Sequence, residues 1–412
     1  MQTNKAHWPS LLILILLAIS VMFVFLIALA LCIGSIVNLV SNDGDPAGQM
    51  ISAFAYGFEM VILLVCAWFV LQKTMGREQA DLPFKFPFAM WQVIAILGLV
   101  GISVLVGGIV AYVKIVWLSW IVLPLLTVLV ITPPIWLLLG LGANKIELGS
   151  RWHVFGALGL GLSIGPFVMI MLEVVMLVVV VCVGIFVIAV QQPALFQEVT
   201  NLENIVELQK NQEAILKLVA PFISNPSVVA IMLGYISLIV PMIEELLKPL
   251  GVWIFAKKID SPAQGFAMGL LGGAAFALIE SLNASGDGSA SWPFIVSVRT
   301  MTSLLHVTTS GLVGWAIVSA FKEKRSIRFF TAYFGAVTLH GVWNACAVGV
   351  GLSTIGESIG KPEWLFNYAP ATLCGMIVLA IGMFSILITA NKRLRIVSPA
   401  PLATVTENEG VQ

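Results

Sequence analysis

The sequence predicts an all-α protein, a polytopic bundle of about ten membrane-spanning helices. Of its 412 residues, 59% are hydrophobic and only 10% are charged, and the mean hydropathy of +1.02 lies far outside the range of soluble domains. The apolar residues form runs of roughly 20 or more, long enough to cross a hydrocarbon core of about 30 Å. Most charged residues fall between these runs.

Ten apolar runs reach this length. The first is about 30 residues long, whereas the apolar core of a signal peptide has roughly 7 to 15, so we expect it to remain as a membrane anchor. In chain order the predicted spans are 11–40, 51–71, 90–113, 115–141, 160–190, 228–256, 262–284, 293–320, 329–350 and 369–390.

Lysine and arginine are divided unevenly between the two sides of these spans. With the N-terminus inside, fifteen lie on the inner side and four on the outer side, while Lys248 and Arg299 lie within spans. Cytoplasmic loops carry an excess of Lys and Arg, so we predict a multi-pass protein of the cell membrane with both termini in the cytoplasm. The net charge of zero offers no basic surface for nucleic acid, and the expected surroundings are the lipid bilayer.

The longest polar connection, at 191–227, divides the chain. Its apolar residues recur at roughly helical spacing among Glu and Lys, which predicts an amphipathic helix on the outer membrane surface. The expected parts are a five-helix membrane scaffold at 1–190, an extracytoplasmic amphipathic segment at 191–227, a second helix bundle at 228–351, an outer loop and last transmembrane helix at 352–395, and a disordered cytoplasmic tail at 396–412.

Ionisable side chains gather in the bundle at 228–351, whereas the five spans before it contain only Glu59 and Glu173. A charge at the middle of a spanning helix costs about 2.5 to 3.5 kcal/mol, so each such residue needs a function or a partner. The ionisable and amide residues of four successive runs are Glu244, Glu245 and Lys248, then Glu280, then Arg299 and His306, then His340 and Asn344.

Helical spacing predicts that each run presents a polar stripe. Glu244 and Lys248 are four residues apart and share a face, and so are His340 and Asn344. Four stripes on consecutive helices are expected to converge on one cavity.

Prolines and glycines are placed to shape these helices. Pro241 and Pro249 flank the glutamate pair and predict a kink there, because proline removes a backbone donor. The small residues Gly269, Gly272 and Gly273 predict close approach of a neighbouring helix.

The adjacent carboxylates favour hydrolysis. Two carboxylates in a dry site do not both ionise easily, so one is expected to keep its proton or to find a cation. A Glu can activate water, a His can carry protons, and a second His with an Asn amide can donate hydrogen bonds to a developing oxyanion. Lys248 and Arg299 are expected to hold the carboxylates in register.

Four short motifs resemble those of the PrsW family of intramembrane proteases, distant relatives of the CAAX prenyl-endopeptidase and bacteriocin-processing superfamily. Glu244–Lys248 is similar to the first motif and Phe276–Glu280 to the second. Arg299 with His306 resembles the third, and His340–Asn344 the closing one. The resemblance implies an intramembrane endopeptidase that cleaves membrane-anchored proteins. By it the catalytic residues are Glu244, Glu245, His306 and His340, and the supporting residues are Lys248, Glu280, Arg299 and Asn344.

Two alternatives stay open. A proton- or ion-coupled transporter also needs buried carboxylates and broken helices, although the chain shows no internal repeat. Among proteases, the His-Glu-x-x-His motif is absent, yet Glu and His residues from different helices can hold a zinc ion. The preferred interpretation is a glutamate-activated water without metal, and no cofactor is assigned.

Residue depth predicts the side from which water enters. Counted at about 1.5 Å per residue from the span ends, Glu245, His306 and His340 lie roughly 18 to 20 Å deep, near mid-membrane. Glu280 lies nearer the outer end of its span, before the polar loop 285–291. We therefore expect access from outside and cleavage within or just outside the substrate's membrane segment, with the 191–227 segment near the entry.

Overall fold

The computed structural model describes residues 7–191, 193, 220, 225–359 and 369–397. Within these ranges, ten helical segments are long and apolar enough to cross a membrane, which confirms the predicted fold class. They are α1 (Trp8–Ser41), α2 (Pro46–Thr74), α3 (Trp91–Val113), α4 (Val116–Gly142), α5 (Arg151–Leu162) continued by α6 (Ile164–Gln191), α10 to α12 described below, α13 (Pro262–Asn283), α14 (Trp292–Glu323), α15 (Ser326–Ile359) and α17 (Ala369–Val397). The predicted amphipathic helix at 191–227 and the tail at 396–412 lie almost wholly outside the described residues.

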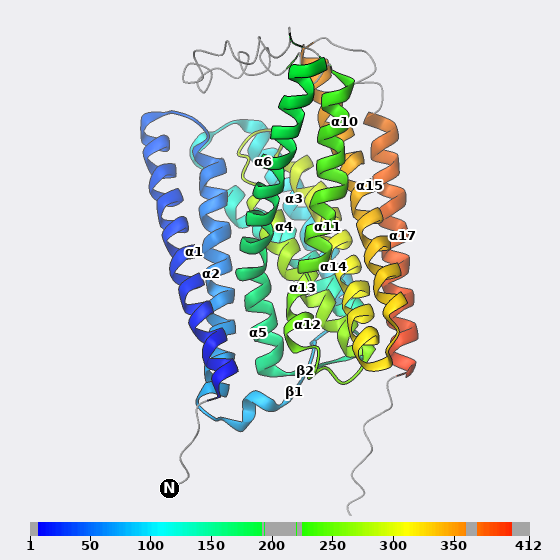
Figure 1. Ribbon diagram of the computed structural model, residues 1–412. Helices are drawn as coiled ribbons and strands as arrows, with labels where there is room; N and C mark the ends of the chain where they lie inside the picture. The colour runs from blue at the N-terminus through cyan, green and yellow to red at the C-terminus, as the bar shows by residue number, and fades with distance from the viewer. Residues whose placement is uncertain (1–6, 192, 194–219, 221–224, 360–368, 398–412) are drawn as a thin grey trace, which may run out of the picture.

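The helices run up and down in one bundle (Figure 1). The start of α1 and the end of α17 lie at the same end of the bundle, as an even number of crossings requires. A two-stranded antiparallel ribbon, β1 (Pro83–Lys85) with β2 (Glu147–Ser150), lies at that end and joins the loops after α2 and α4. The hydropathy pattern does not predict this ribbon.

Helix α13 is the central element. Of its most apolar 18-residue stretch 89% is buried, against 72% in α14 and 39% or less in the other spans. The predicted close approach is confirmed, because a side chain at Gly269 would collide with the carbonyl oxygen of Ser310, and one at Gly273 with that of His306. Glycines on α13 therefore bring it against the α14 backbone beside His306, which positions residues of both helices for the site.

The sixth span is broken into pieces, as its prolines predict. It consists of α10 (Pro226–Gly234), a π-helical turn (Tyr235–Ile239), α11 (Val240–Leu247) and α12 (Leu250–Phe255). In the π-turn the Val240 N–H donates to the Tyr235 carbonyl five residues back. Pro241 has no N–H to donate to Ser237, so two successive carbonyl groups lose their helical partners here.

Candidate active site

The glutamate pair and Lys248 form the centre of a buried polar cluster. Lys248 Nζ lies 2.8 Å from Glu244 Oε2 and 2.8 Å from Glu245 Oε1, so it contacts both neighbours rather than the i+4 partner alone. Glu245 and Lys248 are essentially inaccessible, and Glu244 is 6% exposed. Burial of these charges is tolerated because they neutralise one another.

Helices α13 and α14 contribute a second set of ionic contacts. His306 Nε2 lies 2.6 Å from Glu280 Oε2, and Arg299 Nη1 donates to Glu280 Oε1 at 3.1 Å. The other ring nitrogen of His306, Nδ1, lies 2.7 Å from Lys248 Nζ. Lys248 therefore links the two sets.

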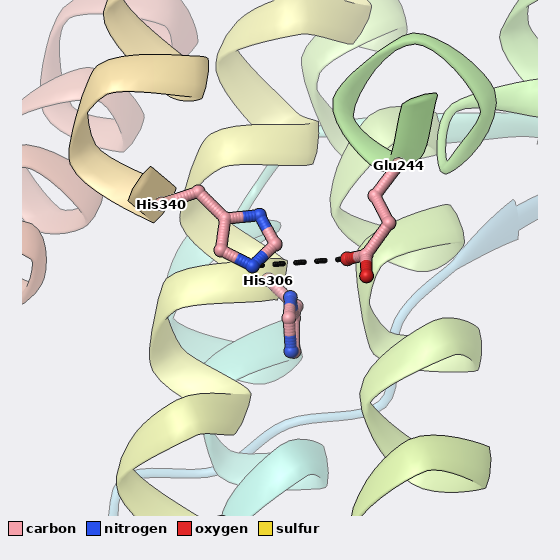
Figure 2. A group of neighbouring side chains, drawn as sticks. All are labelled: Glu244, His306 and His340. Carbon is pink, nitrogen blue, oxygen red and sulfur yellow. Dashed lines mark ion pairs between the residues drawn. The ribbon is translucent and has the colours of Figure 1, made fainter. Parts of the chain in front are cut away.

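His340 of α15 closes the cluster. Its Nδ1 lies 2.8 Å from Glu245 Oε1, and its Nε2 lies 3.7 Å from Glu244 Oε2. Figure 2 shows the His340 and His306 rings and the Glu244 carboxylate pointing toward one another from three helices. One oxygen or nitrogen from each of these three residues lies within 4.8 Å of the others, in buried surroundings.

Each histidine has a carboxylate behind it. The hydrogen bonds assign the proton of His340 to Nδ1, facing Glu245, and the proton of His306 to Nε2, facing Glu280. The lone pairs then lie on His340 Nε2 and His306 Nδ1. A carboxylate that orients the far nitrogen of a histidine is typical of metal-binding histidines.

The broken helix explains the spacing of the last motif. The Ile236 carbonyl, released by the π-turn, accepts a hydrogen bond from Asn344 Nδ2 at 3.0 Å. The Ser237 carbonyl, released by Pro241, lies where a side chain at Gly341 would stand, so only glycine allows this approach. Asn344, one turn after His340, and Gly341, next to it, thereby fasten α15 to the π-turn before α11 and fix the position of the His340 ring.

A cavity of about 470 Å³ opens beside the cluster. Five of the eight residues proposed from sequence as catalytic or supporting line it: Glu244, Glu280, Arg299, His340 and Asn344. Glu245, Lys248 and His306 lie behind this lining and reach it through the contacts above. The structure thus brings all eight residues together, but only part of the set faces open space.

Ten of the residues that line the cavity are missing from the sequence-based set, and two of them have side chains that can donate a hydrogen bond. Thr302 and Trp343 both line the cavity, and Trp343 is otherwise buried. Thr302 lies three residues after Arg299 and four before His306, so helical spacing places it on their face and could have revealed it. Trp343 lies three residues after His340, so the same spacing places it on the His340 face, but aromatic residues on membrane helices are mostly packing groups.

The fold and the site define a class: a multi-pass membrane protein with a buried cluster of carboxylates and histidines beside an intramembrane cavity. The sequence model of the PrsW family of intramembrane metalloproteases matches residues 149–384, more than half of the chain. The chain belongs to this family and is therefore a protease whose substrates are membrane proteins. No curated protein and no solved structure is significantly similar to it.

The family match extends beyond the motifs that suggest it. The four motifs cover only 228–351, whereas the match begins in β2, just before α5, and includes α5 and α6. Family membership favours the protease prediction over the transporter alternative.

Proposed function

We propose that the cluster is the catalytic site of an intramembrane endopeptidase of the cell membrane, and that it cleaves membrane-anchored proteins. The observation that carries the proposal is the arrangement of His306 and His340, each backed by its own carboxylate and each with a ring nitrogen within 4.8 Å of a carboxylate oxygen of Glu244. The residues proposed as catalytic are Glu244, Glu245, His306 and His340, and those proposed as supporting are Lys248, Glu280, Arg299 and Asn344.

The donor set fits a divalent metal ion. Two imidazole nitrogens and one carboxylate oxygen form the three-ligand set of many catalytic zinc sites. Glu244 Oε2 is buried and accepts no hydrogen bond of good geometry, although it lies close to Lys248. We therefore propose that Glu244, His306 and His340 hold zinc, in place of the metal-free mechanism preferred from sequence. When bound, the ion would polarise the substrate carbonyl and lower the pKa of a water molecule.

The remaining carboxylates have separate tasks in this proposal. Glu280 faces the cavity, with its side chain one-third exposed, and is the group placed to accept a proton from the attacking water. Its hydrogen bond to His306 gives that proton a path into the cluster. Glu245 has no exposed surface and acts through His340, whose tautomer and ring orientation it fixes.

Arg299 is suited to stabilise negative charge. It lines the cavity and donates one hydrogen bond to Glu280, and the other N–H groups of its guanidinium can donate to further acceptors. A developing oxyanion in the cavity would find this cation within a site largely shielded from water.

The cavity also supports access from the outer side. Ala284, Phe294 and Ile295 line it, and they lie where α13 ends and α14 begins. In the proposed topology this is the outer end of the bundle. The scissile segment would enter from there and reach Glu244 near mid-membrane.

Accessibility of engineered cysteines tests the route. In a background in which the native cysteines are replaced by Ala, a cysteine at Ala284 is expected to react with an impermeant thiol reagent added outside, and one at Asp260 only with reagent added inside. Cysteines at Glu280 or His306 that react only from the cytoplasmic side would refute outer access. The native cysteines are Cys32, Cys66, Cys182, Cys346 and Cys374.

Cleavage by purified protein in liposomes tests the function. With a membrane-anchored reporter as substrate, Glu244→Gln and Glu245→Gln are each expected to lower the cleavage rate by about 10³-fold or more, because they remove a charge at the reaction centre or behind it. Both should still insert and fold, and Glu59→Gln serves as the matched control. Cleavage at near wild-type rate by both variants would contradict the proposal.

A further inference from the structure

The Lys248 ammonium is unusually placed for a lysine. Its side chain has no exposed surface, and its Nζ makes three short contacts, at 2.7 Å with His306 Nδ1 and at 2.8 Å with an oxygen of each of Glu244 and Glu245. Two of these contacts are hydrogen bonds that the ammonium donates, to Glu245 Oε1 and His306 Nδ1, and the third is an ion pair with Glu244 Oε2. The group is held as a cation in the middle of the cluster.

Two of these acceptors belong to the proposed metal-binding set. The ammonium occupies Glu244 Oε2 and His306 Nδ1, and it also lies 3.3 Å from His340 Nδ1. A lone pair that accepts a hydrogen bond from lysine cannot at the same time bind a metal ion. Two cations this close would also repel each other strongly in surroundings of low dielectric constant.

We infer that Lys248 is an internal competitor for the metal site: its ammonium stands in for the divalent ion on Glu244 and His306, and it must withdraw from both before the ion can bind. This inference rests on the proposed function, since it assumes the ligand set given above. The residue lowers metal affinity and keeps the buried carboxylates paired whenever the ion is absent.

The structure offers a place for the withdrawn ammonium. Glu245 is not in the proposed ligand set, and its Oε2 is buried with no hydrogen-bond partner among the described residues. The Phe276 ring lies on another side of the ammonium, with its centroid 4.6 Å from Nζ. Glu245 and the ring face can therefore hold the cation through a carboxylate contact and a cation–π contact. A small shift suffices, because Nζ already contacts Glu245 Oε1.

Zinc affinity measured by competition with a chromogenic chelator tests the inference without reference to activity. Lys248→Met keeps the length of the side chain and removes its charge, and the variant is expected to bind zinc at least about tenfold more tightly than wild type, because no charge-assisted hydrogen bonds must be broken first. Lys258→Met, at the cytoplasmic end of the same span, should leave the affinity unchanged. Equal or weaker zinc binding by Lys248→Met overturns the inference.

A second pair of variants keeps the test decisive if Lys248→Met does not fold. Glu245→Gln and the double variant Glu245→Gln/Lys248→Met differ only in the lysine, and the double variant removes one charge of each sign. It is expected to bind zinc about tenfold more tightly than Glu245→Gln alone. Equal zinc affinities, or no zinc binding by either protein, would overturn the inference that Lys248 competes with the metal ion.

Failure of this inference is distinguishable from failure of the proposed function. If Glu244→Gln loses cleavage but the lysine variants gain no affinity, the site is catalytic and Lys248 does not compete. If Glu244→Gln cleaves at the wild-type rate, the proposed function fails, whatever the zinc affinities are.

Discussion

The first five spans and the last five contain the same chemical groups in different surroundings. Each half holds two of the four histidines, and each has glutamates on its helices. In the first half, Glu59 is 5% exposed and lines an apolar cavity of about 440 Å³, and no hydrogen bond or ion pair to it is found in the described part of the chain. Among the described residues, His153 forms a hydrogen bond only with Ser150, and its buried Nε2 has no partner.

In the second half every histidine and glutamate of the cluster has a charged or polar neighbour on another helix. His306 pairs with Glu280, and His340 pairs with Glu245. The comparison shows that buried histidines and glutamates are not sufficient to form a site of this kind. What distinguishes the second half is that four helices supply partners to one another, and this can be tested by changing matched residues in the two halves.

The largest expected effect is at His340. Replacing it with Ala removes contacts with Glu244, Glu245 and Lys248 at once, so we expect the cleavage rate to fall by about 10³-fold or more. His153→Ala, in the first half, should stay within about threefold of wild type because its ring contacts no carboxylate. A comparable loss in both variants, measured with the liposome reporter, would mean that the cluster has no special role.

Glu280 is expected to show a smaller but clear effect. Glu280→Gln keeps the shape of the side chain and loses the negative charge that faces Arg299 and His306, so it should lower kcat by about 10 to 100-fold, as loss of a carboxylate behind a metal-binding histidine typically does. Glu59→Gln is the matched change in the first half and should leave kcat within about twofold. An unchanged kcat in Glu280→Gln would exclude this residue as the proton acceptor.

Asn344 should have a modest effect on rate and a measurable effect on stability. Asn344→Ala leaves the Ile236 carbonyl without its donor, at a cost of about 1 to 2 kcal/mol in the free energy of unfolding, and it loosens the position of His340, so kcat should fall by about tenfold. Asn391→Ala is the control, because its amide also bonds free carbonyls, those of Gly142 and Asn144, but far from the site. Asn391→Ala should lower the free energy of unfolding by about as much as Asn344→Ala does and leave kcat unchanged. Equal losses of kcat in the two variants would contradict a positioning role for Asn344.

The sequence predicts much of the fold because lipid imposes a simple rule. An apolar run of sufficient length must be a helix, so ten spans follow from hydropathy alone. The i and i+4 spacing likewise predicts that Glu244 meets Lys248, and the glycines on α13 predict the close approach of a neighbouring helix, which the structure shows to be α14.

Other features require knowledge of contacts between helices. Spacing within one helix does not tell that Glu280 binds His306 or that Glu245 binds His340, since both pairs join residues on different helices. Pro241 predicts a break, but not that the break is a π-turn whose released carbonyls are met by Asn344 and Gly341. The β1–β2 ribbon is also missed, because its strands are only three and four residues long.

Dependence of cleavage on a removable metal ion tests the central claim most directly, namely that Glu244, His306 and His340 form one metal-dependent catalytic centre. Purified wild-type protein is dialysed against a chelator, assayed on the membrane-anchored reporter, and assayed again after zinc is added back. The account predicts loss of cleavage with the chelator, its return with one zinc ion per chain, and neither cleavage nor stoichiometric zinc in a His306→Ala/His340→Ala variant that still inserts into the membrane. Full cleavage by metal-free wild-type protein would contradict it.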